Sequence, residues 1–186
     1  MTDWTRWPFF DDEHRALETE VREWAQKNLC HAHGSDVDAE CRTIVVMLGR
    51  AGFLEHTVAH NGDLPDVRRL AVIRAALAYQ AGLADFSFAM QGLGSGAISL
   101  FGNDTIKKIW LPRVGKGEAI AAFALTEPET GSDAAAIATS YETVRKLSRA
   151  HAKRTVLVGN PARIECVRIG AEPFPARENA DPWGIF

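Results

Sequence analysis

Residues 119–133 constrain the fold of this chain more than any other segment. Residues 119–126 are almost wholly apolar and lack the spacing of an amphipathic helix, which favours a buried strand. The strand leads into a turn in which Pro128 lacks a backbone donor and Gly131 can adopt a positive φ. Ser132 then offers a local side-chain cap. Such a turn presents successive N–H groups, which bind phosphate or carbonyl oxygens well.

Upstream of this segment, capping residues and apolar stripes at helical spacing predict five helices. The first helix is predicted to begin at Asp11 or Asp12 as its cap, and the second at Ser35 or Asp36, closing near Gly49 and Gly52. The third helix opens at Asp66, with Gly82 after its end, and the fourth runs from about Phe86. The fifth spans Asn103 to Leu111, with Pro112 near its close. The predicted buried side chains are Leu17, Val21, Trp24, Ile44, Val45, Leu48, Leu70, Ile73 and Leu77, with Val37 and Cys41 on the stripe of the second helix. Residues 60–65 are predicted to form a loop.

The last 46 residues differ in composition from the rest of the chain. Residues 141–186 carry 8 Lys and Arg against 5 Asp and Glu, whereas residues 1–140 carry 13 against 19. Four of the eight prolines also fall in this tail. We therefore predict that it packs poorly on the rest, although its pattern permits a helix over residues 141–153 and a strand over residues 155–158.

Composition excludes some classes of partner and location. A net charge of −3 gives no reason to expect nucleic acid or an anionic membrane as a partner. No run approaches the ~20 apolar residues of a membrane span, and no secretion signal or transit peptide is visible at the N-terminus. The three cysteines stand at unrelated spacings, which favours reduced thiols and a cytoplasmic location.

Residues 123–133, Phe-Ala-Leu-Thr-Glu-Pro-Glu-Thr-Gly-Ser-Asp, resemble the flavin signature of the acyl-CoA dehydrogenase family, Thr-Glu-Pro-x-x-Gly-Ser-Asp after an apolar strand. Residues 9–15 resemble the opening helix of that family. Residues 82–92, 100–102 and 110–118 resemble its helices before the flavin strand. The resemblance covers residues 9 to about 139 and then stops.

This resemblance implies an oxidoreductase of fatty acid metabolism that uses FAD. A carboxylate would remove the α-proton of an acyl-CoA thioester while the β-hydride passes to the flavin, and an electron-transfer flavoprotein would reoxidise it. By resemblance, the residues that would contact FAD are Phe123, Leu125 and Thr126 along the isoalloxazine ring, and Gly131 and Ser132 near the pyrophosphate. Ser132 would also lie near the acyl-CoA.

The expected architecture is mainly α: a helical N-terminal domain (1–118), the first strand and flavin-binding turn of a β domain (119–140), and an atypical tail (141–186). None of the five tryptophans precedes an isoleucine, so the second flavin motif of the family, Trp-Ile-Ser or Trp-Ile-Thr, is absent from the sequence. In the family, the catalytic base comes from a later helical domain. We therefore assign no catalytic residue and expect a truncated, catalytically incomplete member of an oligomeric family. The alternatives are a helical interaction module without enzymatic activity, acting as a partner subunit of an intact homologue, and a fragment without function.

Four other patterns have purely structural interpretations, and we favour that interpretation for the first three. Gly92-Leu-Gly-Ser-Gly96 fails the spacing of a dinucleotide loop and predicts close helix packing. Glu127 and Glu129 read as solvated carboxylates, because nothing in the sequence desolvates them. No metal is assigned: Cys30, His31, His33 and Cys41 do not form a convincing zinc set, and His56 with His60 reads as a solvated pair. The aromatic residues Trp4, Trp7, Phe9 and Phe10 form either a staple on the first helix or a subunit contact.

Overall fold

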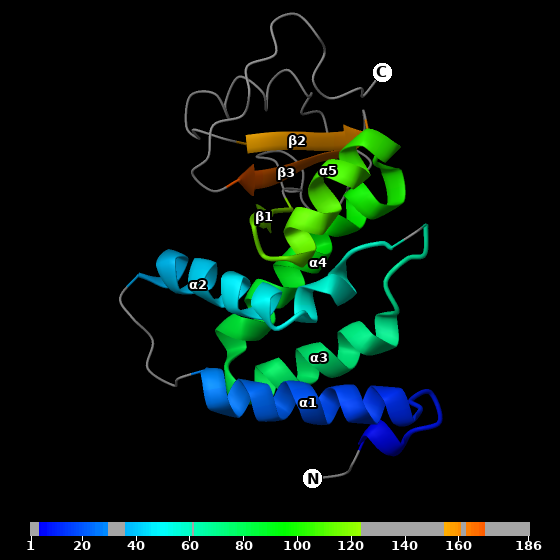
Figure 1. Ribbon diagram of the computed structural model, residues 1–186, viewed down its shortest axis with the longest axis vertical. Coiled ribbons are helices and arrows are strands. Elements are labelled where there is room, and N and C mark those ends of the chain that lie inside the picture. The colour runs from blue at the N-terminus through cyan, green and yellow to red at the C-terminus, as the bar shows by residue number, and fades with distance from the viewer. Residues whose placement is uncertain (1–3, 30–35, 61, 124–154, 161–162, 170–186) are drawn as a thin grey trace, which may run out of the picture.

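The computed structural model describes residues 4–29, 36–60, 62–123, 155–160 and 163–169, and in these ranges helices predominate (Figure 1). The elements are η1 (Trp4–Arg6), α1 (Asp12–Asn28), α2 (Val37–Arg50), η2 (Phe53–Thr57), α3 (Val67–Gln80), α4 (Gly82–Phe101), α5 (Asp104–Gly115), β1 (Ala119–Ala121), β2 (Thr155–Asn160) and β3 (Arg163–Ile169). The expected mainly α fold with a helical N-terminal part is confirmed.

Side-chain caps start four of the five described α-helices. Asp11, Asp36, Asp66 and Asn103 each accept a hydrogen bond from a backbone N–H in the first turn of the helix that follows. A cap of this kind stabilises a helix by about 1 kcal/mol. The predicted starts of α1, α2, α3 and α5 are therefore confirmed.

The start of α4 was predicted wrongly. We expected Gly82 to follow α3 and the next helix to begin near Phe86, but α4 begins at Gly82 itself. Ala81 alone separates the two helices, with an extended backbone that turns the corner. The first turn of α4 is held because Ala84 is fully buried and Asp85 pairs with Arg74 of α3.

Helix α5 also continues further than predicted. We expected it to close near Leu111, but it runs through Pro112 to Gly115. The carbonyl of Pro112 accepts a hydrogen bond from the N–H of Lys116, 3.1 Å away. Val114 in this last turn is fully buried, so tertiary packing outweighs the tendency of proline to end a helix.

The predicted core is largely confirmed. Seven of the nine predicted side chains are buried, and the other two, Trp24 and Leu70, are half-buried against the same cluster. Val37 was placed wrongly on the stripe of α2, because it is the first residue of that helix and its side chain is 53% exposed. Of the N-terminal aromatic residues, Trp4 and Phe10 pack edge-to-face on each other and lie against the core, as a staple would. Trp7 and Phe9 are exposed.

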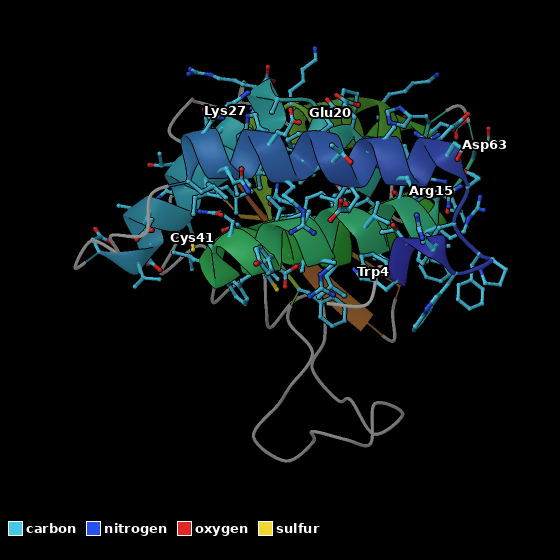
Figure 2. The ribbon with its side chains drawn as sticks, turned by 90° about the horizontal axis from the view of Figure 1, so that it is seen from below. Trp4, Arg15, Glu20, Lys27, Cys41 and Asp63 are labelled. Atoms are coloured by element: carbon cyan, nitrogen blue, oxygen red, sulfur yellow. The ribbon has the colours of Figure 1, made fainter. Side chains whose placement is uncertain are left out.

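Helices α1 and α3 lie side by side at the lower end of the molecule and start at the same end (Figures 1 and 2). His14 joins these two starts and is only 2% exposed. Its Nδ1 lies 2.7 Å from an oxygen of Asp11, the cap of α1, and its Nε2 lies 3.4 Å from an oxygen of Asp66, the cap of α3. Arg68 donates to the carboxylate of Asp66 as well.

A three-stranded antiparallel sheet in the order β1-β3-β2 lies at the opposite end (Figure 1). The predicted strand over residues 119–126 is shorter in the described residues, because it ends at Ala121. The strand predicted over residues 155–158 is present as β2. Strand β3 was not predicted, and it pairs with β1 so that Ile120 lies opposite Arg168. This pairing joins residues 163–169 to the strand that follows the helices, and poor packing of the tail stays a prediction. The helix predicted over residues 141–153 lies outside the described residues.

The charge on Asp66 should stabilise the fold in a pH-dependent way. Partial burial raises the pKa of the Asp66 carboxyl, but hydrogen bonds and positive charge from Arg68 outweigh this effect and hold the pKa at about 2. A depressed folded-state pKa stabilises the fold above the unfolded value, near 3.8, and this contribution is lost as the pH falls through about 2.

We expect Asp66→Asn, which keeps the cap but removes the charge, to lower the free energy of unfolding by roughly 0.2–1 kcal/mol at pH 7. The difference from wild type should shrink as the pH falls from 4 to 2, as measured by urea denaturation at each pH. Asp63→Asn, in the exposed loop before α3, is the matched control and should show no such trend. A difference for Asp66→Asn that does not change with pH would contradict this role of the charge.

Candidate functional site

A cavity of about 240 Å³ lies between α2, α4 and β1. Its lining residues are Asp38, Cys41, Arg42 and Val45 of α2, Phe86, Ser87, Met90 and Gln91 of α4, and Ile120 and Ala121 of β1. Most of these side chains are apolar. The cavity reaches Ala121, the last residue of β1.

The charged residues of the cavity lie on its exposed side. Asp38 stands in the first turn of α2, where the helix dipole favours a carboxylate. Arg42 follows one turn later, and both side chains are exposed. The interior of the cavity is therefore apolar, with charge available only at its solvent side.

Gln91 fixes β1 against α4. The side chain is 1% exposed, its Nε2 donates to the carbonyl oxygen of Ala119 at 2.9 Å, and its Oε1 accepts from the N–H of Ala121 at 2.7 Å. Both backbone groups point to the same edge of β1, because they belong to residues two apart in a strand. The amide of Gln91 thus occupies the edge of β1 that β3 leaves free.

Gly94 lets α4 approach β1 closely. A Cβ atom at this position would lie 2.7 Å from the Cβ of Ala121 and 2.7 Å from the N of Ala122. Residues 92–96 lie inside α4, so the prediction of close helix packing is confirmed for Gly94. It is wrong for Gly96, which has open space beyond its Cα.

The turn between α5 and β1 packs on α2. Gly117 has a φ of +70°, and a Cβ there would lie 2.6 Å from the carbonyl oxygen of Val45. A Cβ at Gly49 would lie 2.3 Å from the carbonyl oxygen of Lys116. These contacts hold the start of β1 beside the helix that forms the other wall of the cavity.

Among the predicted flavin-binding residues, the structure describes only Phe123. It lies two residues after β1 and is half-buried. Leu125, Thr126, Gly131 and Ser132 lie outside the described residues, as do Glu127 and Glu129. The structure therefore brings Phe123 and the cavity to the same end of β1.

The residues considered as metal ligands do not gather into a site in the described part of the chain. There, no group of three or more His, Cys, Asp and Glu side chains could hold a metal ion. Cys30, His31 and His33 lie outside the described residues, and Cys41 is a free, half-buried thiol in the cavity wall.

His56 and His60 were read as a solvated pair, and this is wrong for His56, which is half-buried. Burial lowers the pKa of His56, and the charges of Arg69 and His60 lower it further. The Nε2 of His60 lies 2.9 Å from the carbonyl oxygen of Glu55.

Sequence reasoning missed the cavity residues of α2 and α4, because they come from segments about 45 residues apart in the sequence. One signal was present: α4 carries a single charged residue, Asp85, in 20 positions. A helix with so little charge is expected to have several covered faces rather than one.

Comparisons with known proteins agree on one family for this chain. A family model described as acyl-CoA dehydrogenase, N-terminal domain, matches residues 11–118. A probable acyl-CoA dehydrogenase, fadE25, of Mycobacterium leprae is 30% identical over 149 residues, covering 75% of this chain and 38% of that protein. The human mitochondrial very long-chain specific acyl-CoA dehydrogenase is 52% identical over 52 residues, covering 28% of this chain and 8% of that protein.

A solved structure agrees with these sequence matches. The crystal structure of glutaryl-CoA dehydrogenase from Mycobacterium smegmatis superposes with a TM-score of 0.61 at 28% identity, covering 70% of this chain and 35% of that one. The chain belongs to the acyl-CoA dehydrogenase family, and it spans less than two-fifths of the length of these relatives. None of the helices in the described ranges has the length and apolar character needed to cross a membrane.

Two glycines of α4 provide a matched test of the contact with β1. Gly94→Ala should destabilise the fold by roughly 1–3 kcal/mol, because the new methyl group overlaps Ala121. Gly96→Ala, in the same helix but facing open space, should stabilise it by up to about 1 kcal/mol through helix propensity. Thermal and urea unfolding of both variants would measure the difference. Equal effects of the two substitutions would contradict a close α4–β1 contact.

Proposed function

We propose that this chain supplies one side of the site at which an acyl-CoA thioester is dehydrogenated between its α and β carbons with FAD as the hydride acceptor. The observation that carries this proposal is the apolar cavity at the end of β1, directly before the segment with the flavin signature. Family membership supports the reaction class. We also propose that the domain boundaries lie at residues 118/119 and 140/141. A cytoplasmic location belongs to the same proposal, and the free thiol of Cys41 is compatible with it.

The cavity suits the acyl part of the substrate. Its volume of about 240 Å³ lies just below the roughly 300–1,000 Å³ of sites that bury a drug-sized ligand. Val45, Phe86, Met90 and Ile120 offer apolar contacts to a hydrocarbon chain. The nucleotide end of the coenzyme is too large and too polar for this space, so only a short acyl group would enter.

FAD would be held by the segment that starts at Phe123. A half-buried aromatic side chain at the end of a strand fits the need of the isoalloxazine ring for a flat apolar wall. Leu125, Thr126, Gly131 and Ser132 would complete the contacts to the ring and the pyrophosphate, with Ser132 also near the acyl-CoA. When bound, FAD supplies the acceptor for the β-hydride, and an electron-transfer flavoprotein is the proposed partner that reoxidises it.

The chain by itself should lack the base for the reaction. Asp38 is the one carboxylate that lines the cavity, and it is exposed in the first turn of α2. Removal of the α-proton therefore needs a base from elsewhere, and loss of general-base help lowers the rate roughly 10²–10⁴-fold.

The acyl cavity can be tested through Cys41. In a Cys30→Ser, Cys166→Ser background, we expect butyryl-CoA to slow alkylation of Cys41 by iodoacetamide about tenfold at a concentration about ten times its Kd. Mass spectrometry of the labelled protein over time gives the rate. Adenosine diphosphate, which has the phosphates but no acyl chain, should give no protection.

Two tryptophan substitutions distinguish the cavity from the surface around it. Met90→Trp fills the cavity and should remove the protection by butyryl-CoA. Val46→Trp, on the exposed side of α2, should keep it. Full-rate labelling in the presence of butyryl-CoA would contradict the placement of the acyl group.

Dehydrogenase activity is tested by flavin reduction. We expect the purified chain to bind FAD weakly and to show no bleaching of the flavin band after anaerobic addition of butyryl-CoA, because one wall cannot bury the ligand or position a base. The M. leprae relative, assayed in parallel, is the positive control. Rapid bleaching would mean that this chain supplies a base itself, and Glu165 and Glu172 would then be the first residues to replace.

A further inference from the structure

The side-chain amide of Gln91 is matched to two backbone groups of opposite kind. The carbonyl oxygen of Ala119 can only accept a hydrogen bond, and the N–H of Ala121 can only donate one. The Nε2 and Oε1 atoms of Gln91 lie 2.9 and 2.7 Å from these two groups, so both ends of the amide are used. A side chain of similar size that lacks either atom would leave a buried backbone group of β1 without this partner.

Strand β1 has few other constraints. It is three residues long and pairs with β3 along one edge. The backbone groups of Ala119 and Ala121 that Gln91 contacts lie at the other edge, because backbone groups alternate between the two edges of a strand. Gln91 therefore determines how the second edge of β1 lies against α4.

Gln91 is itself held in place. The Oγ of Ser95, one turn further along α4, lies 2.7 Å from the carbonyl oxygen of Gln91 and 2.9 Å from that of Thr57 in η2. A Cβ atom at Gly94 would overlap Ala121, so α4 and β1 are already in close contact beside the amide. The amide is thus a fixed point from which β1 takes its position.

Phe123 lies close enough to this fixed point to depend on it. It follows Ala121, the last residue of β1, by two residues, and two residues of extended chain span at most about 7 Å. A shift of β1 therefore moves Phe123, the first residue of the segment with the flavin signature. Misplacement by about 1 Å can be costly at a site that must orient its ligand.

We propose that Gln91 is a positioning residue for FAD: its amide holds β1 on α4 and thereby places Phe123 beside the isoalloxazine ring. This role rests on the proposed function. Gln91 acts through the backbone of β1 and does not need to touch the flavin. Loss of its amide should therefore lower the affinity for FAD while the helices stay folded.

FAD affinity tests this role. The full chain, at up to about 500 μM, is titrated into about 1 μM FAD, and fluorescence polarisation of the flavin reports binding. Gln91→Met keeps the size of the side chain but loses both hydrogen bonds, and it should weaken FAD binding at least about tenfold. Ser99→Ala is the matched control, because Ser99 is buried in the same helix and its Oγ accepts a hydrogen bond from the N–H of Ala59, away from β1. This variant should bind FAD like wild type.

Gln91→Glu adds a rescue that depends on pH. The protonated carboxyl can donate to the carbonyl of Ala119 and accept from the N–H of Ala121, whereas the ionised form cannot donate. Burial raises the pKa of such a carboxyl. Relative to wild type at each pH, FAD affinity of Gln91→Glu should rise as the pH falls from about 8 to about 5.5, and that of Gln91→Met should not. The charged residues of the cavity, Asp38 and Arg42, are the same in all these proteins.

Hydrogen exchange supplies a readout that does not need FAD. Exchange of the Ala121 amide should accelerate at least about tenfold in Gln91→Met, while the amides of α1 and α3 keep their wild-type rates. Faster exchange throughout the chain would show a general loss of stability and overturn the positioning role. If Gln91→Met does not fold, the pH series of Gln91→Glu decides.

The outcomes separate this role from the proposed function. Wild-type affinity for FAD in Gln91→Met, or no dependence on pH in Gln91→Glu, would overturn the role of Gln91 and leave the proposed function intact. A wild-type chain that binds no FAD would overturn the proposed function and this role with it.

Discussion

The position of β1 depends on the buried amide of Gln91. This side chain hydrogen-bonds to the carbonyl of Ala119 and the N–H of Ala121 at one edge of β1. Strand β3 pairs with the other edge. Without it, two buried backbone groups would lack partners, at roughly 1–3 kcal/mol each. Gly94, one turn further along α4, removes the side chain that would keep the strand away. The contact of α4 with β1 therefore sets the position of the cavity and of the residues that lead into the flavin-signature segment.

At the lower end of the molecule, polar contacts join the starts of α1 and α3, which also pack together through the apolar core. Asp11 and Asp66 each cap a helix with one carboxylate and also face the two nitrogens of His14. Because α1 and α3 start at the same end, one imidazole can connect both caps. These contacts hold the start of α1 beside the start of α3, and buried residues of α2 and α4 complete the same core cluster.

Helix α4 makes different contacts on its different sides. One side carries Gln91 and Gly94 toward β1, and another packs Phe88 and Ala84 in the core. The outward side exposes apolar side chains, namely Phe86, Leu93, Leu100 and Phe101. These apolar sides agree with a helix that carries one charged residue, Asp85, and its N-cap residue, Ala81, has no side-chain oxygen that could cap it.

The sequence by itself determined the caps, most of the buried stripes and the membership of the family, because these depend on residues close together in the chain. For this reason, helix starts can be recognised from the sequence at Asp11, Asp36, Asp66 and Asn103. Tertiary structure alone decided the course of α5 through Pro112, the start of α4 at Gly82, the pairing of β3 with β1, and the joining of residues from α2, α4 and β1 into one cavity. Each of these depends on contacts between segments far apart in the sequence. A local sequence pattern cannot show whether burial of Val114 offsets the tendency of Pro112 to end a helix, or whether a strand has a partner to pair with.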